Sequence, residues 1–177
     1  MAKDKLMIKF VDKGWLKIVS EVSKLDGLAV EAGVNGAEGA AEHGDSGQSV
    51  AFIAMVQEFG TEQVPDRPFI RPALAWDGRS ALAGRMAAAA AAVCTGRLTA
   101  WGAMQGIGVF SADRIREKLW SQVGPENAPS TVAKKMQGMT LRDSFQMANA
   151  IGYQIISKTV AAILDGSIGE DVEIGGE

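Results

Sequence analysis

The sequence has almost none of the residues that build disulfides and transition-metal sites. Its 177 residues include one cysteine, Cys94, and one histidine, His43. A single cysteine excludes an internal disulfide and a cysteine-based zinc cluster. His43 lies in a glycine-rich stretch with no cysteine beside it, so we expect it to be solvated. Cys94 lies in an alanine run, which predicts a small buried side chain rather than a reactive thiol. The sequence therefore predicts no metal site and no cofactor.

The sequence also lacks a recognisable catalytic arrangement. Ser144 follows Asp143, but no strained glycine turn and no histidine stands near them. No pair of carboxylates has a spacing that requires general acid–base chemistry. The glycines of GVNGAEGAAEHG are not followed by the lysine–serine pair of a phosphate-binding loop. We expect a protein that is not an enzyme.

Long apolar runs and an excess of positive charge are missing as well. The longest apolar run, MAAAAAAVC, is far shorter than the roughly 20 residues that a membrane-spanning helix needs. The net charge of −3 gives no general attraction to a phosphate backbone. With 47% hydrophobic and 22% charged residues, the composition is that of a globular domain. We expect one domain over residues 1–177.

Apolar periodicity and capping signals predict the elements of the first third. Asp12 is the expected N-cap of an amphipathic helix with Trp15, Ile18, Val22 and Leu25 on one face. Ser49 and Gly60 are the expected start and stop signals of a later helix. In order, we expect a strand over 5–12, a helix over 13–25, a strand over 27–34, a flexible glycine-rich loop over 35–48 and a helix over 49–59.

The remainder is predicted to be mostly helical, followed by a last strand. A helical region begins at Pro72, breaks between Thr95 and Thr99, and continues to about Gln122. Another element is expected to approach the face shared by Gly102, Gly106 and Gly108. A turn-rich loop carrying a single helical turn, a short helix or turn, a strand over 150–157 and a small strand over 171–175 follow, with a flexible tail over 166–177. The fold class is α+β: a small antiparallel or mixed sheet packed against two or three helices, with the long glycine-rich loop.

One stretch, VQEFGTEQVPDRPFIRPAL, stands out from its surroundings. Its three prolines, at positions 65, 68 and 72, exclude a central strand or a regular helix interior, so we expect an ordered extended loop. Arg67 and Arg71 can form bidentate pairs with carboxylates, and Phe69 can fill an apolar pocket. The residues leave two interpretations open: a stiff connector packed on its own domain, or a surface that binds another molecule.

Two segments carry a resemblance to a known family. EFGT, a short spacer, PDRPFIRPAL and a long helical region resemble the neck proteins of tailed bacteriophages, the virion-morphogenesis or tail-completion proteins. The family's second segment reads Pro-Leu-Ile-Asp-Thr-Gly-Gln-Met-x-x-Ser-Ile-x-Tyr-x-Val, which TLRDSFQMANAIGYQI resembles. The sequence departs from it at Thr140, Arg142 and Phe145, where proline, an aliphatic residue and glycine are usual. The resemblance covers about Gly27 to Ile156, and it keeps Leu141, Asp143, Gln146, Met147, Ile151 and Tyr153.

The resemblance implies a structural virion protein that is assembled in the bacterial cytoplasm. Copies would pack side by side in a ring, six-fold in such families, between the capsid portal and the tail. Its neighbours would be portal, adaptor, tail-terminator or tail-tube proteins, with no membrane, and DNA would only pass through the lumen. The expected assembly interface consists of Glu58, Phe59, Gly60, Thr61, Arg67, Pro68, Phe69, Arg71, Asp143 and Tyr153.

Three alternatives remain open at this level. A tail-terminator ring protein would share the same features. A nucleic-acid-binding regulator could use Arg67, Arg71, Lys134 and Lys135, and its binding would depend steeply on salt. A small hydrolase would need a cleft with converging polar groups, for which the sequence offers no triad.

Overall fold

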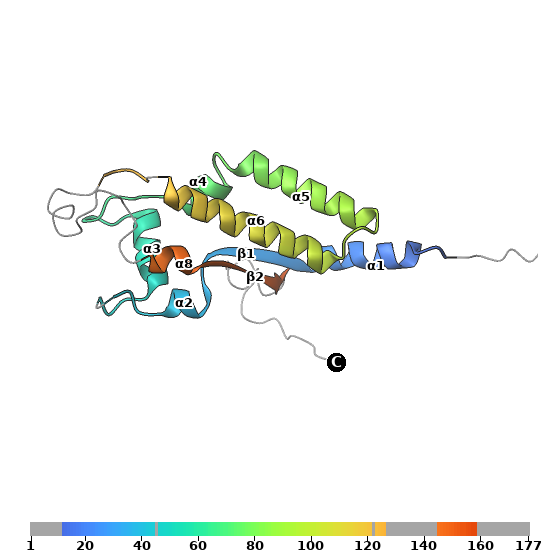
Figure 1. Ribbon diagram of the computed structural model, residues 1–177, viewed down its shortest axis with the longest axis horizontal. Coiled ribbons are helices and arrows are strands. Elements are labelled where there is room, and N and C mark those ends of the chain that lie inside the picture. The colour runs from blue at the N-terminus through green and yellow to red at the C-terminus, as the bar shows by residue number, and fades with distance from the viewer. Residues whose placement is uncertain (1–11, 45, 122, 127–144, 159–177) are drawn as a thin grey trace, which may run out of the picture.

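The described part of the chain is built around one long helix, α6, that packs along a two-stranded antiparallel sheet (Figure 1). The computed structural model describes residues 12–44, 46–121, 123–126 and 145–158. The helices are α1 (Trp15–Asp26), α2 (Gly36–Ala40), α3 (Val50–Phe59), α4 (Ile70–Leu74), α5 (Arg79–Cys94), α6 (Ala100–Trp120) and α8 (Gln146–Asn149). The α+β class, with a small antiparallel sheet packed against helices, is confirmed.

The sheet joins two segments that are far apart in the sequence. Strand β1 (Leu28–Val34) pairs antiparallel with β2 (Ile151–Ser157), in a register that runs from Leu28 opposite Ser157 to Val34 opposite Ile151. The alternation of apolar residues predicted both strands, and both are present. Helix α6 packs on both strands, so the sheet and this helix form the middle of the molecule.

The close approach expected at the glycines of α6 occurs at Gly108. A Cβ atom there would lie 2.1 Å from Cδ2 of Tyr153, so only glycine lets the tyrosine ring of β2 lie against the helix. At Gly106 a Cβ would meet only the end of the Arg85 side chain. At Gly102 it would meet the hydroxyl of Thr99, the helix's own N-cap. The sheet therefore touches α6 at one of the three glycines.

The predicted break between Thr95 and Thr99 is present, and helices α5 and α6 on its two sides form an antiparallel hairpin. The α6 end of the turn is fixed by Thr99, whose hydroxyl accepts a hydrogen bond from the Gly102 amide at 3.1 Å. Val93 is buried in the hairpin, but Cys94 is exposed. The prediction of a buried cysteine is therefore wrong, because the next residue of a helix is rotated by about 100° and here faces solvent.

The helical region predicted from Pro72 is interrupted earlier than expected. Pro72 lies in the first turn of α4, which ends at Leu74, and α5 begins only at Arg79. Between them the chain folds back tightly, since a Cβ on Gly78 would lie 1.6 Å from the Ala73 carbonyl oxygen. The extended loop predicted over the proline-rich stretch therefore ends at Phe69, because α4 already begins at Ile70.

Helix α1 is present, but Gly14 and not Asp12 occupies its N-cap position, and Asp12, two residues earlier, supplies the side chain that accepts from the first amides. Its Oδ1 atom accepts hydrogen bonds from the amides of Gly14 (3.0 Å) and Trp15 (2.7 Å). The predicted apolar face is only half covered: Leu25 packs against the Val93 cluster, whereas Trp15 is 63% exposed. No residue of α1 is fully buried.

The long flexible loop predicted over 35–48 is not confirmed. The first part of this segment forms α2, and Gly39 is buried because it packs against the backbone of Val34, where a Cβ would approach to 3.2 Å. Beyond α2, the Glu42 carboxylate accepts from the Gly47 amide at 2.7 Å. At Gly39, glycine permits close packing against the backbone, whereas the glycine content of the segment, taken alone, predicted a flexible loop.

Several predictions fall outside the described residues. They are most of the first strand (5–11), the turn-rich loop over 127–139, Asp143 and the tail over 166–177 with its small strand. Among the residues that are described, no helix is long and apolar enough to cross a membrane.

Candidate functional site

The chain reverses direction directly after α3. Gly60 has a φ of 73°, and a Cβ on it would lie 2.9 Å from the Asp66 amide nitrogen, so both conformation and space favour glycine. Thr61 closes the turn: its amide donates to the Val64 carbonyl at 2.8 Å, and its hydroxyl accepts from the Val64 amide at 3.0 Å. The segment that returns from the turn is held to α3 by a hydrogen bond, which the Arg67 amide donates to the Gln57 carbonyl at 2.6 Å.

The carboxylate of Glu58 organises the segment that follows. It is 3% exposed, and it accepts hydrogen bonds from three successive amides: Phe69 (2.7 Å), Ile70 (2.9 Å) and Arg71 (2.9 Å). These amides form the N-terminus of α4, which would otherwise hold unpaired donors. Glu58 therefore caps a helix that begins 12 residues later, and its negative charge is favourable at that helix end.

Arg71 completes this cluster and reaches the surface. Its Nε donates to Glu58 Oε1 at 3.0 Å and its Nη2 donates to the Glu58 carbonyl. The guanidinium lies over the rings of Phe59 (4.7 Å) and Trp76 (5.3 Å). Because an arginine can stack on aromatic faces while it pairs with a carboxylate, one side chain joins the buried ion pair to two exposed rings.

Arg67 ties the segment to the chain after α6. Its side chain donates to the carbonyls of Pro125 (2.9 Å) and Glu126 (3.3 Å) and to Gln57 Oε1 (3.3 Å). Its fellow anchor Phe69 is fully buried in the main apolar core. Both residues therefore stabilise the subunit from inside. We call the residues Glu58, Arg67, Phe69 and Arg71 the brace.

The residues predicted as an assembly interface divide into three groups. Glu58, Arg67 and Phe69 are buried; Phe59 and Thr61 are exposed; Gly60, Pro68, Arg71 and Tyr153 are partly covered. Tyr153 lies against α6 at Gly108 and packs on the core cluster that also contains Phe69, and Asp143 is outside the described residues. Of this set, Phe59 and Arg71 come together at the surface.

The outer face of α3 carries a feature that the sequence reasoning missed. The inner face is buried through Val50, Ala54 and Glu58, while Phe52, Met55 and Phe59 are all exposed on the opposite side. Their spacing of three and four residues places them in one row. We call this row, in which Phe59 is 64% exposed, the α3 stripe. The available signal was the segment VAFIAMVQEF itself, in which every residue except Gln57 and Glu58 is apolar, so that apolar side chains occur on every side of the helix.

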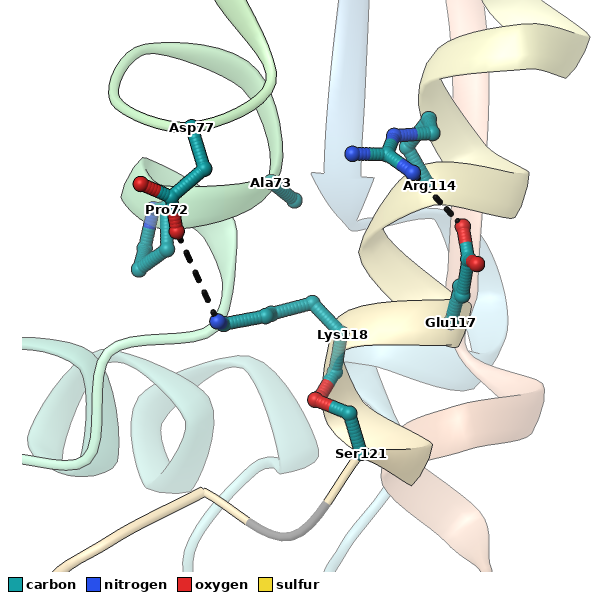
Figure 2. A pocket seen from close by; sticks show the side chains of 7 residues that line it. All are labelled: Pro72, Ala73, Asp77, Arg114, Glu117, Lys118 and Ser121. Atoms are coloured by element: carbon teal, nitrogen blue, oxygen red, sulfur yellow. Dashed lines mark hydrogen bonds and ion pairs between the residues drawn. The ribbon is translucent and has the colours of Figure 1, made fainter.

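A small cavity lies between α4 and the end of α6 (Figure 2). It has a volume of about 170 Å³ and is lined by side chains of both charges, with Lys118 Nζ 3.8 Å from Asp77 and Arg114 Nη1 2.8 Å from Glu117. Pockets for small ligands usually have volumes of about 300–1,000 Å³ and a mainly apolar lining. The cavity therefore does not resemble a substrate site.

The turn before β2 contains Phe145, one of the positions at which TLRDSFQMANAIGYQI departs from the family that it resembles. Phe145 has a φ of 58°, a left-handed conformation that glycine adopts most easily, and its ring stacks on Trp120 at 5.6 Å. Glycine is the usual residue of the resembled family at this position. The backbone thus keeps the conformation that a glycine would have, and the aromatic stack offsets the cost of a side chain there.

No group of three or more His, Cys, Asp or Glu side chains that could hold a metal ion occurs in the part of the chain that the structure describes. No protein-family model, curated protein or solved structure matches the chain.

Proposed function

We propose that the chain is a structural subunit of a tailed-bacteriophage head–tail connector, a neck or tail-completion protein whose copies pack side by side in a ring. What supports this family is the resemblance in order and spacing of EFGT, PDRPFIRPAL and the segment before β2. The left-handed backbone at Phe145, where that family has glycine, supports the alignment of the second segment. Its neighbours in the virion would be portal, adaptor, tail-terminator or tail-tube proteins, and a place as the tail-terminator ring is the alternative within the same class.

The observation that carries an assembly role is the exposure of the α3 stripe. A helix that is apolar on all sides is normally covered on all sides. Here one side of α3 is covered by its own domain and the other is not. Contiguous apolar surface of this kind marks an interaction site, and aromatic and methionine side chains are enriched at the centres of protein interfaces.

The brace makes this surface rigid before it binds. Glu58 and Phe59 are neighbours in α3, so the hydrogen bonds of the Glu58 carboxylate fix the end of the helix where Phe59 is exposed. Arg71 holds the Phe59 ring from the other side. A binding surface that is already ordered loses less conformational entropy on association. The stretch VQEFGTEQVPDRPFIRPAL thus stabilises the proposed assembly surface. Phe59 and Arg71 belong both to this stretch and to the surface.

The structure offers less support for the two alternatives from other classes, a nucleic-acid-binding regulator and a hydrolase. Two of the four cations that a nucleic-acid-binding regulator would use, Arg67 and Arg71, already donate to acceptors inside the subunit. The other two, Lys134 and Lys135, lie outside the described residues. A hydrolase would use a cleft with converging polar groups. The cavity in Figure 2 has opposite charges that pair with each other. A larger hollow of about 600 Å³ between α1 and the start of α6 has a mainly apolar lining, and its charged side chains, Glu21 and Lys24, also pair with each other.

The test is a polar substitution on the stripe with a matched control. Met55 and Met86 are 52% and 50% exposed, but Met86 lies on α5, away from the brace. We expect Met55→Asp to melt like the wild-type chain and to fail to restore infectious particles to a phage that lacks its own copy. Filled heads and finished tails should then accumulate unjoined in electron micrographs. Met86→Asp should restore particles. Normal particle yield with Met55→Asp would overturn the proposal.

A further inference from the structure

The larger hollow lies where α1, β1 and the start of α6 meet, and we call it the α1–α6 hollow. Figure 1 shows α1 and the start of α6 at the same end of the molecule, away from α3. The largest side chain of its mainly apolar lining, Trp101, is exposed. Its volume of about 600 Å³ leaves room for an occupant. The lining residues are Glu21, Lys24, Gly27, Leu28, Thr99, Ala100 and Trp101.

The polar side chains of the hollow already have partners inside the subunit. The Glu21 carboxylate accepts from Lys24 Nζ and from the Ala100 amide, both at 2.7 Å. The Thr99 hydroxyl accepts from the Gly102 amide at 3.1 Å. A polar occupant would have to replace these hydrogen bonds in order to form its own, and such an exchange gains little free energy. The hollow therefore suits an apolar occupant.

The last described residues of the chain lie at the edge of this hollow. Ser157, the end of β2, pairs with Leu28, and the Lys158 amide donates to the Gly27 carbonyl at 3.0 Å. Gly27 and Leu28 both line the hollow. Two residues of extended chain span at most about 7 Å. The chain can therefore enter the hollow from Val160 onward.

The sequence after Lys158 begins with an apolar run. Residues 160–164, VAAIL, contain no polar side chain, and the first carboxylate comes at Asp165. The rest of the chain, DGSIGEDVEIGGE, alternates carboxylates and glycines with single apolar residues. Residues 160–164 are therefore the part of this end of the chain that matches an apolar hollow.

The other two long segments outside the described residues join the molecule elsewhere. Residues 1–11 join it at Asp12, before a helix of 12 residues whose other end lies at the hollow, a length of about 18 Å. Residues 127–144 run from Glu126, whose carbonyl accepts from Arg67 of the brace, to Phe145, which stacks on Trp120 at the last residue of α6. Of these three segments, 159–177 is the one that begins at the hollow.

We propose that residues 160–164 occupy the α1–α6 hollow of their own subunit and hold α1 against the start of α6. Because the segment is covalently attached beside the hollow, its docking is intramolecular, with an effective concentration in the millimolar range. A separate molecule has no such advantage. Helix α1 has no fully buried residue of its own among the described contacts, and this cover would bury part of its last turn. The inference goes beyond the proposed function, since it concerns how one subunit is completed whatever its role.

Disulfide trapping tests this contact directly. In a Cys94→Ser background, which removes the exposed natural thiol, Trp101→Cys is combined in turn with Val160→Cys, Ile163→Cys and Leu164→Cys. Oxidation should link at least one of these positions to position 101 within a single chain, which requires their Cβ atoms to come within about 4.5 Å. Mass spectrometry of the linked peptides identifies the pair, and the unreduced chain should migrate as a monomer.

The matched control replaces Trp101→Cys by Val109→Cys, another exposed residue of α6, about 12 Å further along the helix. It should not link to the segment. Links at position 109 as frequent as those at 101 would overturn the inference, as would the absence of any link to 101. Links that form only between two chains would assign the hollow to the segment of a second copy and overturn the arrangement within one subunit.

Hydrogen exchange tests the consequence for α1 in a chain without added cysteines. Ile163→Asp places a charge in the apolar run, and a charged side chain is costly to bury without a partner. The amides of residues 21–28 and 99–104 should then exchange about tenfold faster, the factor that corresponds to losing the burial of one isoleucine side chain. Ile174→Asp makes the same change beyond the run and should exchange like the wild-type chain. Equal exchange in the two variants would overturn the inference.

Discussion

The brace and α1 are the two ends of the same molecule, and they are built in opposite ways. At the brace, Glu58 and Arg67 are buried, Arg71 is partly covered, and each of the three has hydrogen-bond partners: the Glu58 carboxylate, for example, accepts from three amides and from Arg71. At α1, no side chain is fully buried, and apolar residues such as Trp15 face outward. One end is held by polar groups inside, and the other leaves apolar groups outside. The comparison teaches that a conspicuous motif can act by supporting a surface that is made of ordinary residues.

The largest expected effect tests the internal role of the brace. Phe69→Ala should lower the free energy of unfolding by about 3–5 kcal/mol, because it leaves a cavity in the main core. Trp15→Ala on α1 removes an even larger aromatic side chain, but an exposed one, and should change stability by less than about 0.5 kcal/mol. Urea unfolding of both variants measures the difference. If Trp15→Ala costs as much as Phe69→Ala, the two ends are not built differently.

Much of the framework could be predicted because its signals are local. The Ser49 cap, the Gly60 stop and the break between Thr95 and Thr99 each depend on residues within a few positions, and all three are present. The alternation of apolar residues likewise predicted both strands. These features need no knowledge of what lies across the fold.

What could not be predicted depends on residues that are distant in sequence. The sequence suggested carboxylate partners for the arginines, but the Glu58 carboxylate also caps α4, and that is set by the turn at Gly60. Gly39 looked like a loop residue because its contact with Val34 is invisible locally. Periodicity likewise finds the apolar residues of α1 and α3 but cannot tell which of their faces the domain covers. The α3 stripe was therefore missed, although Phe59 was among the predicted interface residues.

A smaller effect tests whether the stability of the fold depends on the charge of Glu58 as well as on the size of its side chain. Glu58→Gln keeps the size of the side chain but turns an amide group toward amide donors, which leaves at least one buried donor unpaired. We expect a loss of about 2 kcal/mol in the free energy of unfolding. The matched control is Glu117→Gln on α6, whose carboxylate pairs with Arg114 at 2.8 Å on the surface. Exposed pairs of this kind contribute about 0–1 kcal/mol, so the control should lie near the wild-type value. Equal losses in both variants would mean that the buried carboxylate is not what organises the brace.

The smallest effect concerns the bond that holds α1 to the body, and it should appear as a dependence on pH. The hydrogen bond from Lys24 and the one from the Ala100 amide hold the pKa of Glu21 below its ordinary value. A carboxylate whose pKa is lowered by folding stabilises the fold above its ordinary pKa of about 4.3, and this contribution disappears as the pH falls toward the lowered value. Protection of the α1 amides from hydrogen exchange, relative to those of α6, should therefore decrease in acid.

Two variants show whether Glu21 is responsible. Glu21→Gln should weaken the protection of α1 at neutral pH and remove most of its further decrease in acid. Asp26→Asn is the matched control: the pKa of Asp26 is also lowered, through its hydrogen bond with Lys158, but that bond leads to the end of β2 and leaves the Glu21–Ala100 bond intact. The control should keep the acid-dependent decrease that Glu21 causes. If Glu21→Gln keeps it too, α1 is held to the body by its apolar contacts with α5 and α6, and the polar attachment of this end contributes nothing measurable.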